Sequence, residues 1–290
     1  MGTHKSTNKD TGAQPLAFTG LRVDVPLHWY HADESAVSKT QLDDLEHSPW
    51  VFWARHRAPD RPARPDPTPA MFTGTLAHCA ILEPHAFDER YPTGPEVDTR
   101  AAKVWKEWAA RLAPDQVGVK PSERATAFAQ AAAVRQVQPL AELLAKGVPE
   151  VSAYWVDAAS GVRCRCRPDW VHPVGTGVIL VDVKTATNAH PRDFGRSVVN
   201  FSYHVQAAFY SDGYEAASGA PVLGFVFAAC EKDYPYAAAA CMLTDEDLEA
   251  GRRRYRASLA TYAECQRTGV WPGWGDTVHL LQLPAWAMKD

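Results

Sequence analysis

The chain has 290 residues, a formal net charge of -4, 46% hydrophobic residues and 22% charged residues. This is an ordinary globular composition, and a chain of this length can bury a core without disulfides. The charge argues against a nucleic-acid coat protein, but not against an enzyme with a local basic groove. The six cysteines form no C-x-x-C pair, so they predict neither a zinc site nor an iron–sulfur cluster.

The sequence shows no secretory leader and no run of about 18 apolar residues. We therefore expect a cytoplasmic protein with no membrane partner.

The pattern of apolar, capping and turn residues predicts helices first and strands later. A capping box at 38–41 opens a helix that Pro49 divides or kinks. The other predicted helices cover 70–83, 100–112, 122–146, 191–199, 203–217 and, from a Thr244 cap, 244–267. The predicted strands cover 151–156, 162–170, 177–184, 222–230 and 236–243, of which the first three form a meander.

This order predicts one mixed α/β (α+β) domain over residues 21–290, after a disordered tail at 1–20. Its expected parts are a helical N-terminal part at 38–146, an α/β core at 147–268 and an irregular C-terminal tail at 269–290.

Two of the predicted strands bring two carboxylates and a lysine together. Asp169 closes the strand at 162–170, while Asp182 and Lys184 leave the same face of the next strand. Asp182 follows the apolar run 178–181, so its charge needs a partner or a metal. Carboxylates favour Mg²⁺ or Mn²⁺, and a lysine beside such a site suits phosphodiester hydrolysis. Taken alone, a D-x-K tripeptide is more often a surface salt bridge.

Two further helices carry polar side chains with suitable spacing. His78 shares a helix face with Gly74 and could be an imidazole ligand supported by Glu83. Gln206 and Tyr210 project from one face of a later helix and could contact phosphate, water or a base. Separately, a buried core histidine and an ordinary amphipathic helix explain these residues as well.

In combination and in this order, these residues resemble the PD-(D/E)xK nuclease superfamily, in the branch of lambda exonuclease and the RecB nuclease domain. The motifs are closer still to those of the C-terminal nuclease domain of RecE, exodeoxyribonuclease VIII. The resemblance covers roughly residues 27 to 270, and its matching stretches are 30–33, 37–42, 74–84, 182–186 and 203–214. It implies a nuclease-like core with a mixed central sheet of about five strands, flanked by helices.

The resemblance also implies roles for individual residues. The metal ligands would be His78, Asp169, Asp182 and the backbone carbonyl of Val183, and Lys184 would position or activate the attacking water. The remaining candidates are DNA-contacting or supporting residues: Gln206 and Tyr210 at the site, Arg192 and Arg196 on phosphate, and Glu83 and Glu150 as carboxylates behind the ligands or on a second metal.

The activity so implied is a Mg²⁺-dependent exonuclease on double-stranded DNA ends, 5′→3′, in phage or prophage recombination. Mn²⁺ could substitute for Mg²⁺. The implied assembly is a homo-oligomer such as a tetrameric ring, with a single-strand annealing recombinase as functional partner. Two alternatives stay open: an endonuclease or a flap or single-strand nuclease of the same fold, and a non-catalytic module that binds DNA or protein.

Overall fold

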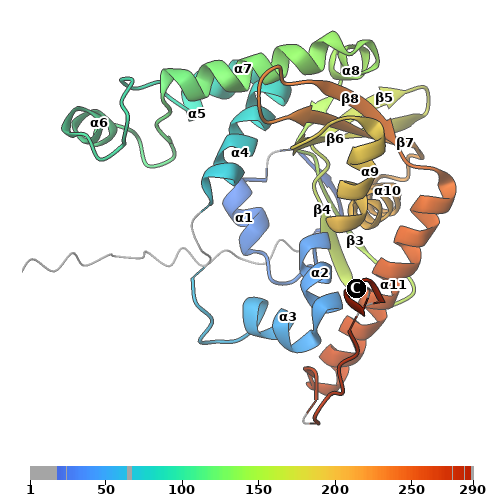
Figure 1. The fold of residues 1–290 in the computed structure, drawn as a ribbon. Helices are drawn as coiled ribbons and strands as arrows, with labels where there is room; N and C mark the ends of the chain where they lie inside the picture. Colours follow the sequence, from blue (N-terminus) through green and yellow to red (C-terminus); the bar gives the residue numbers. More distant parts are fainter. Residues whose placement is uncertain (1–17, 24, 64–66, 276, 284, 289–290) are drawn as a thin grey trace, which may run out of the picture.

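The computed structural model describes residues 18–23, 25–63, 67–275, 277–283 and 285–288, and Figure 1 shows their arrangement. The strands form a three-stranded sheet in the order β1-β3-β4 and a five-stranded sheet in the order β2-β5-β6-β7-β8. The strands are β1 (Gly20–Arg22), β2 (Val148–Pro149), β3 (Ser152–Val156), β4 (Arg163–Cys166), β5 (Trp170–Val174), β6 (Gly177–Ala186), β7 (Val222–Glu231) and β8 (Ala238–Met242).

The larger sheet is mixed, because its central pair β6–β7 is parallel and the other pairs are antiparallel. Two helices, α9 (Pro191–Asn200) and α10 (Tyr203–Ser218), make the crossover that a parallel pair requires. The expected fold class, a mixed five-stranded sheet flanked by helices, is confirmed.

The other helices lie mainly before the strands. They are α1 (Leu27–Ala32), α2 (Lys39–His47), α3 (Pro49–His56), α4 (Pro69–Leu82), the 3₁₀ turn η1 (Pro84–Ala86), α5 (Phe87–Arg90), α6 (Lys103–Ala109), α7 (Pro121–Gln136), α8 (Gln138–Leu144), α11 (Asp245–Thr268) and the 3₁₀ turn η2 (Ala285–Met288).

Prolines decide where two predicted helices break. Pro49 occupies the first position of α3 and so divides the helix that the capping box opens. The single helix expected at 122–146 is wrong, because α7 ends at Gln136 and Pro139 lies in the first turn of α8. The helix expected at 100–112 is shorter than predicted and covers only α6.

The expected three-strand meander is also wrong. β4 ends at Cys166, and β5, which begins at Trp170, belongs to the other sheet. Pro168 has no backbone N–H to continue a ladder, so the chain turns there and crosses between the sheets. Asp169 therefore immediately precedes a strand instead of closing one.

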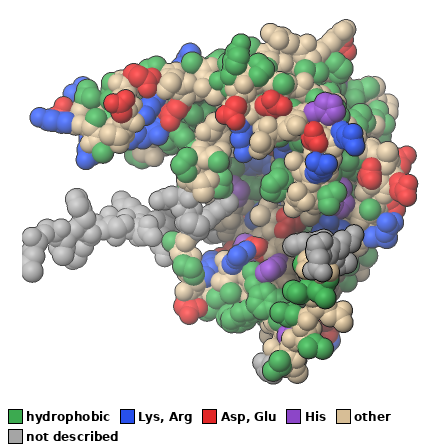
Figure 2. Space-filling model, viewed as in Figure 1, with side chains coloured by type: hydrophobic (Ala, Val, Ile, Leu, Met, Phe, Trp, Pro, Cys, Tyr) green, Lys and Arg blue, Asp and Glu red, His purple; other side chains and the backbone are tan. Residues whose placement is uncertain are grey.

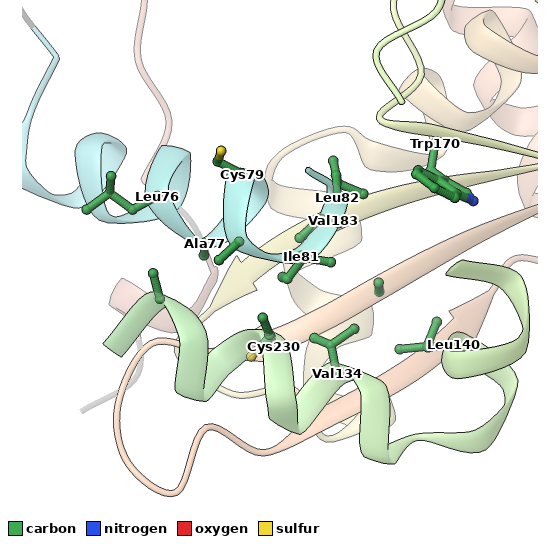
Figure 3. Packing of buried hydrophobic residues seen from close by; sticks show 14 of the residues in the cluster. Leu76, Ala77, Cys79, Ile81, Leu82, Val134, Leu140, Trp170, Val183 and Cys230 are labelled. Atoms are coloured by element: carbon green, nitrogen blue, oxygen red, sulfur yellow. The ribbon is translucent and has the colours of Figure 1, made fainter. Parts of the chain in front are cut away.

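Helices cover both faces of the five-stranded sheet (Figure 1). On one face, α4, α7 and α8 pack on Val181 and Val183 of β6 and on alternate residues of β7. Figure 3 shows this packing, with Ile81 of α4 and Val134 of α7 directed toward the strands. On the other face, α9 and α10 pack on Leu180 and on the remaining residues of β7. The residues of β6 with even numbers, including Asp182 and Lys184, thus belong to the α10 side.

Helix α10 lies between the two sheets. Its residues Val205 and Phe209 belong to a second core with β3, β4, α2, α3 and α11. Ala207 and Tyr214 of the same helix belong to the core on β6 and β7. The position of α10 is therefore fixed from two sides.

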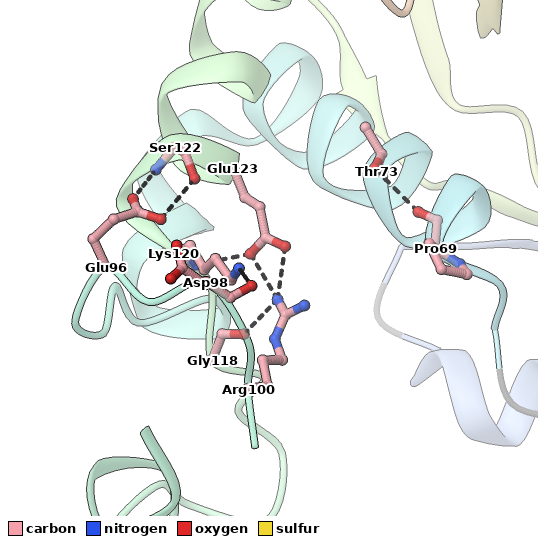
Figure 4. Close-up of polar contacts among 9 residues, drawn as sticks. All are labelled: Pro69, Thr73, Glu96, Asp98, Arg100, Gly118, Lys120, Ser122 and Glu123. Carbon is pink, nitrogen blue, oxygen red and sulfur yellow. Dashed lines mark hydrogen bonds and ion pairs between the residues drawn. The ribbon is translucent and has the colours of Figure 1, made fainter. Parts of the chain in front are cut away.

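A segment between α5 and α7 carries α6 away from the main body and is fastened by polar contacts (Figure 4). Glu123 accepts two hydrogen bonds from Arg100 at 2.9 and 2.6 Å and caps the start of α7 through Lys120 N at 2.7 Å. Glu96 accepts hydrogen bonds from the backbone N–H and the hydroxyl of Ser122 at 3.0 and 3.1 Å. These contacts anchor the segment to the N-terminus of α7.

The tail expected at residues 1–20 falls mostly on residues 1–17, which lie outside the described residues. Gly20 already belongs to β1, which pairs with β3. Among the residues described here, no helix combines the length and hydropathy needed to cross a membrane. The single-domain boundaries stay a prediction.

Gly251 of α11 allows that helix to approach the backbone of α10, because a Cβ added there would lie 2.3 Å from the carbonyl oxygen of His204. We expect Gly251→Ala to lower the free energy of unfolding by about 1–3 kcal/mol through overpacking. Gly195 of α9 is the matched control, since a Cβ there meets no atom within 4 Å. Gly195→Ala should raise that free energy by about 0.5–1 kcal/mol. Chemical denaturation checks both, and equal effects of the two variants would contradict the packing of α10 against α11.

Candidate active site

The site lies where the chain crosses twice between the two sheets. Glu150 lies on the crossing from β2 to β3, and Asp169 lies on the crossing from β4 to β5. The backbone N–H of Glu150 donates a hydrogen bond to the carbonyl oxygen of Asp169 at 3.0 Å, so the two crossings are joined. Glu150 has a φ of 53°, a left-handed conformation that is costly for a residue other than glycine. Such strain is concentrated at functional sites.

Helix α4 adds an imidazole to these two carboxylates. His78 Nδ1 lies 3.5 Å from Oδ2 of Asp169, and the same oxygen accepts a 2.7 Å hydrogen bond from the backbone N–H of Val183. One potential ligand atom from each of His78, Glu150 and Asp169 lies within 4.8 Å of the others. Two crossings and one helix thus contribute three metal-ligating groups to one place.

Asp182 is the most deeply buried charge of the site, with a relative exposure of 1%. Gln206 of α10 donates a 2.5 Å hydrogen bond from Nε2 to Oδ1 of Asp182. Lys184 Nζ lies 2.6 Å from Oδ2, but this oxygen has no hydrogen-bond partner of good geometry. The amide of Gln206 therefore holds Oδ1, and the ammonium of Lys184 faces Oδ2 as an ion pair.

Lys184 remains an ammonium in this environment. Burial lowers the pKa of Lys184, but the carboxylates of Asp182 and Asp169 outweigh it, and the net shift is upward. The ammonium also lies 4.6 Å from the centre of the Tyr203 ring, an attractive cation–π arrangement. Lys184 is thus suited to donate hydrogen bonds or offset negative charge, and not to act as a base.

Each carboxylate of the site makes its neighbours harder to ionise, because their negative charges repel one another. Burial, followed by the neighbouring Asp169, raises the pKa of Glu150 from 4.5 to about 8. Burial also raises the pKa of Asp182 from 3.8 to about 6, against the opposing effect of Lys184 and with a further upward contribution from Asp169. Like charges held together in a poorly solvated place are stabilised by a bound cation.

These residues fit a divalent metal ion of the hard, oxygen-binding kind. Asp169, Asp182, Glu150 and His78 offer three carboxylates and one imidazole, a donor set that suits Mg²⁺ or Mn²⁺. The observation that most favours such an ion is the close approach of His78, Glu150 and Asp169, whose potential ligand atoms lie within 4.8 Å of one another.

The structure brings some of the other candidates to the site and leaves others away from it. Tyr210, four residues after Gln206 on α10, has its pKa raised mainly by burial, with a smaller contribution from Asp182. Glu83 is held by Arg90 through hydrogen bonds of 2.6 and 2.8 Å and lies outside the three-residue cluster. The DNA-contacting roles of Gln206 and Tyr210 and the carbonyl ligand of Val183 stay predictions.

Arg192 and Arg196 lie on the exposed face of α9 and contact none of the site carboxylates. Arg196 Nη1 lies 3.5 Å from Asp193 Oδ1 in the preceding turn. Their role as phosphate-binding residues stays a prediction.

Sequence reasoning underrated Glu150 and missed two residues on the α10 side, Tyr203 and Lys39. The sequence suggested Glu150 only as a carboxylate behind the ligands or on a second metal, although the preceding Gly147 and Pro149 mark a break before a strand. Tyr203 and Lys39 lie within stretches that carry the family resemblance, which was the available signal. Lys39 is buried and donates to the carbonyl oxygen of Phe201 at 3.1 Å.

Closely spaced arginines in β4 and α11 take part in ion pairs and packing. Arg252 and Arg254 of α11 bind Asp212 and Glu46 at 3.0 and 2.8 Å. Arg165 and Arg167 of β4 are buried with the ring of Tyr30 beneath their guanidinium groups. Figure 2 shows basic and acidic side chains mixed over α6 and α7. Net charge therefore says little about where a polyanion would bind.

A mixed sheet flanked by helices, with two aspartates, a D-x-K lysine and a nearby glutamate, defines a nuclease-like domain of the PD-(D/E)xK type. The chain belongs to the family described as PDDEXK-like domain of unknown function (DUF3799), whose model matches residues 38–284. No curated protein matches the sequence significantly. Among solved structures, the chain is similar to a protein from Eubacterium rectale named "Putative exonuclease", with a TM-score of 0.57 and 12% identity over 92% of this chain and 88% of that one. That similarity shows the fold.

The raised pKa of Glu150 gives a prediction for the metal-free protein. A pKa of about 8 in the folded state, against an ordinary 4.5, means that the folded protein binds this proton more tightly than the unfolded chain. The contribution of Glu150 to the free energy of unfolding therefore falls as the pH rises from about 4.5 to about 8.

Glu150→Gln removes this titration and keeps the side-chain volume. In the presence of a chelator, the variant should exceed the parent in free energy of unfolding at pH 9, by on the order of 3 kcal/mol, and the difference should shrink toward pH 5. Urea denaturation at a series of pH values measures it. A difference that does not depend on pH would show that Glu150 is not held among like charges.

Proposed function

We propose that this protein is a metal-dependent nuclease that hydrolyses phosphodiester bonds in DNA. The family and the fold support a nuclease in general. The observation that carries the proposal is the buried Asp182 carboxylate, ion-paired to a lysine that stays cationic, beside the cluster of His78, Glu150 and Asp169. If the Asp182–Lys184 ion pair were purely structural, it would not require two more carboxylates, Glu150 and Asp169, beside it.

The residues of the chain have separable tasks in this chemistry. His78, Glu150, Asp169 and Asp182 would hold the divalent ion, which when bound lowers the pKa of water and neutralises phosphate charge. Lys184 donates from its ammonium to the attacking water or to a phosphate oxygen where negative charge increases. Gln206 keeps the Asp182 carboxylate in one orientation through the hydrogen bond to Oδ1.

We further propose that the nuclease is Mg²⁺-dependent, with Mn²⁺ able to substitute, and acts as a 5′→3′ exonuclease on double-stranded DNA ends. The support is the resemblance to RecE and lambda exonuclease, together with the carboxylate-rich donor set. Arg192 and Arg196, exposed on α9, would bind phosphates of the incoming strand.

The same resemblance supports a homo-oligomer, such as a tetrameric ring around DNA, and a single-strand annealing recombinase as partner in phage-type recombination. A ring would reconcile the net charge of -4 with DNA binding, because only its channel needs to be basic.

Asp182→Asn and Lys184→Met should each lower the rate of nucleotide release from linear duplex by at least about 100-fold, because each removes charge at the reacting phosphate. The matched controls are Asp115→Asn and Lys106→Met, on exposed side chains in the segment between α5 and α7. Release of acid-soluble nucleotides in Mg²⁺ is the measurement, with circular dichroism to show that each variant is folded. Full activity of both site variants would refute the assignment, and a folded parent protein without nuclease activity would favour a non-catalytic binding module.

Duplexes labelled at either the 5′ or the 3′ end test the proposed polarity. The 5′ label should be released first as mononucleotides, and closed circular duplex should resist digestion. Cleavage of the circle would instead establish an endonuclease, and early loss of the 3′ label would reverse the polarity.

A further inference from the structure

We propose that Phe201, supported by Tyr203, is a stacking platform for a nucleobase of the strand that is being cut. The inference rests on the proposed function and adds a substrate-contacting residue to it: the site would recognise the flat face of a base next to the reacting phosphate.

A continuous series of contacts joins Phe201 to the centre of the site. The rings of Phe201 and Tyr203 are stacked, with centroids 5.5 Å apart and planes 28° apart. Lys184 Nζ lies 4.6 Å from the centre of the Tyr203 ring and 2.6 Å from Oδ2 of Asp182. The stacked pair of Phe201 and Tyr203 therefore lies against Lys184, the lysine that the proposed hydrolysis uses.

Within this pair, Tyr203 is packed among other aromatic rings, whereas the ring of Phe201 is open to solvent. Tyr203 also packs against Phe194 and Phe227, with ring centroids 6.2 and 5.9 Å away. Phe201 has a relative exposure of 61%. Single exposed apolar residues are common on proteins, but this one extends an aromatic stack outward from a candidate active site.

The backbone that presents Phe201 is held by a buried charge. Lys39 is only 7% exposed, and its Nζ donates to the carbonyl oxygen of Phe201 at 3.1 Å. Asp43 holds the same ammonium at 2.8 Å. The next residue, Ser202, has a φ of 52°, which is unusual for a residue other than glycine. The strained backbone at Ser202 and the hydrogen bond from the buried Lys39 together hold the backbone of Phe201 in one position.

A nucleobase is the ligand that this arrangement fits best. Every base has a π-face, so aromatic stacking binds unpaired nucleotides without selecting a sequence. The exposed face of α9, with Arg192 and Arg196, leads toward Phe201 at its C-terminal end and offers cations for the backbone phosphates of the same strand. Stacking requires an unpaired base, so the platform would favour the frayed end of a duplex over its paired interior.

Fluorescence of 2-aminopurine, which is quenched when the base stacks, tests the platform without hydrolysis. Oligonucleotides with 2-aminopurine at successive positions from the 5′ end would be bound to Asp182→Asn protein, which blocks cleavage. We expect quenching at one position with Phe201, retention in Phe201→Tyr, and loss in Phe201→Leu and Phe201→Ala. Val199→Ala, at a nearby side chain that is 66% exposed, should keep the quenching. Equal quenching with Phe201→Ala would overturn the proposal.

Hydrolysis gives a second, independent readout in the otherwise unaltered protein. Phe201→Ala and Phe201→Leu should lower kcat/KM about 5- to 100-fold on an ordinary duplex end. On a duplex with an abasic site at the quenched position, parent and variant should react at equal rates. The same loss on both substrates would overturn stacking. Absence of hydrolysis by the parent would refute the proposed nuclease function, while the fluorescence experiment would still decide whether a base stacks on Phe201.

Discussion

The candidate site depends on one constraint: two crossings between the sheets are joined backbone to backbone, from the N–H of Glu150 to the carbonyl of Asp169. This bond holds two carboxylates together although their charges repel, and the strained φ of Glu150 is part of the same geometry. Repulsion and burial raise the pKa of Glu150 and of Asp182. The pKa of Asp182 stays raised although Lys184 lies beside it, so the site favours a further positive charge.

Helix α10 connects this constraint to the rest of the molecule. Because it packs between both sheets, its first turn can hold Gln206 on Asp182 and the Tyr203 ring on Lys184. The buried Lys39 of α2 fixes the turn immediately before it. The helical N-terminal part thus supplies His78 and also determines how α10 begins. Its contribution to the site is structural as well as chemical.

The elements with strong local signals could be predicted from the sequence. The strand that carries Asp182 and Lys184 follows from its apolar run, and the capping residues at Ser38 and Thr244 mark real helix starts. The change of sheet after Cys166 could not be predicted, because strand pairing depends on distant partners and not on local alternation. For the same reason Glu150 was underrated: its proximity to Asp169 exists only once both crossings have formed.

Anomalous X-ray scattering from crystals of the protein soaked in Mn²⁺ tests the proposed metal centre most directly. We expect a single strong anomalous peak, or two adjacent ones, within bonding distance of Asp169 and Asp182 and next to His78 and Glu150. A well-ordered site with the same side-chain positions and no anomalous peak would contradict it, and the carboxylates would then be a structural charge cluster instead of a metal centre.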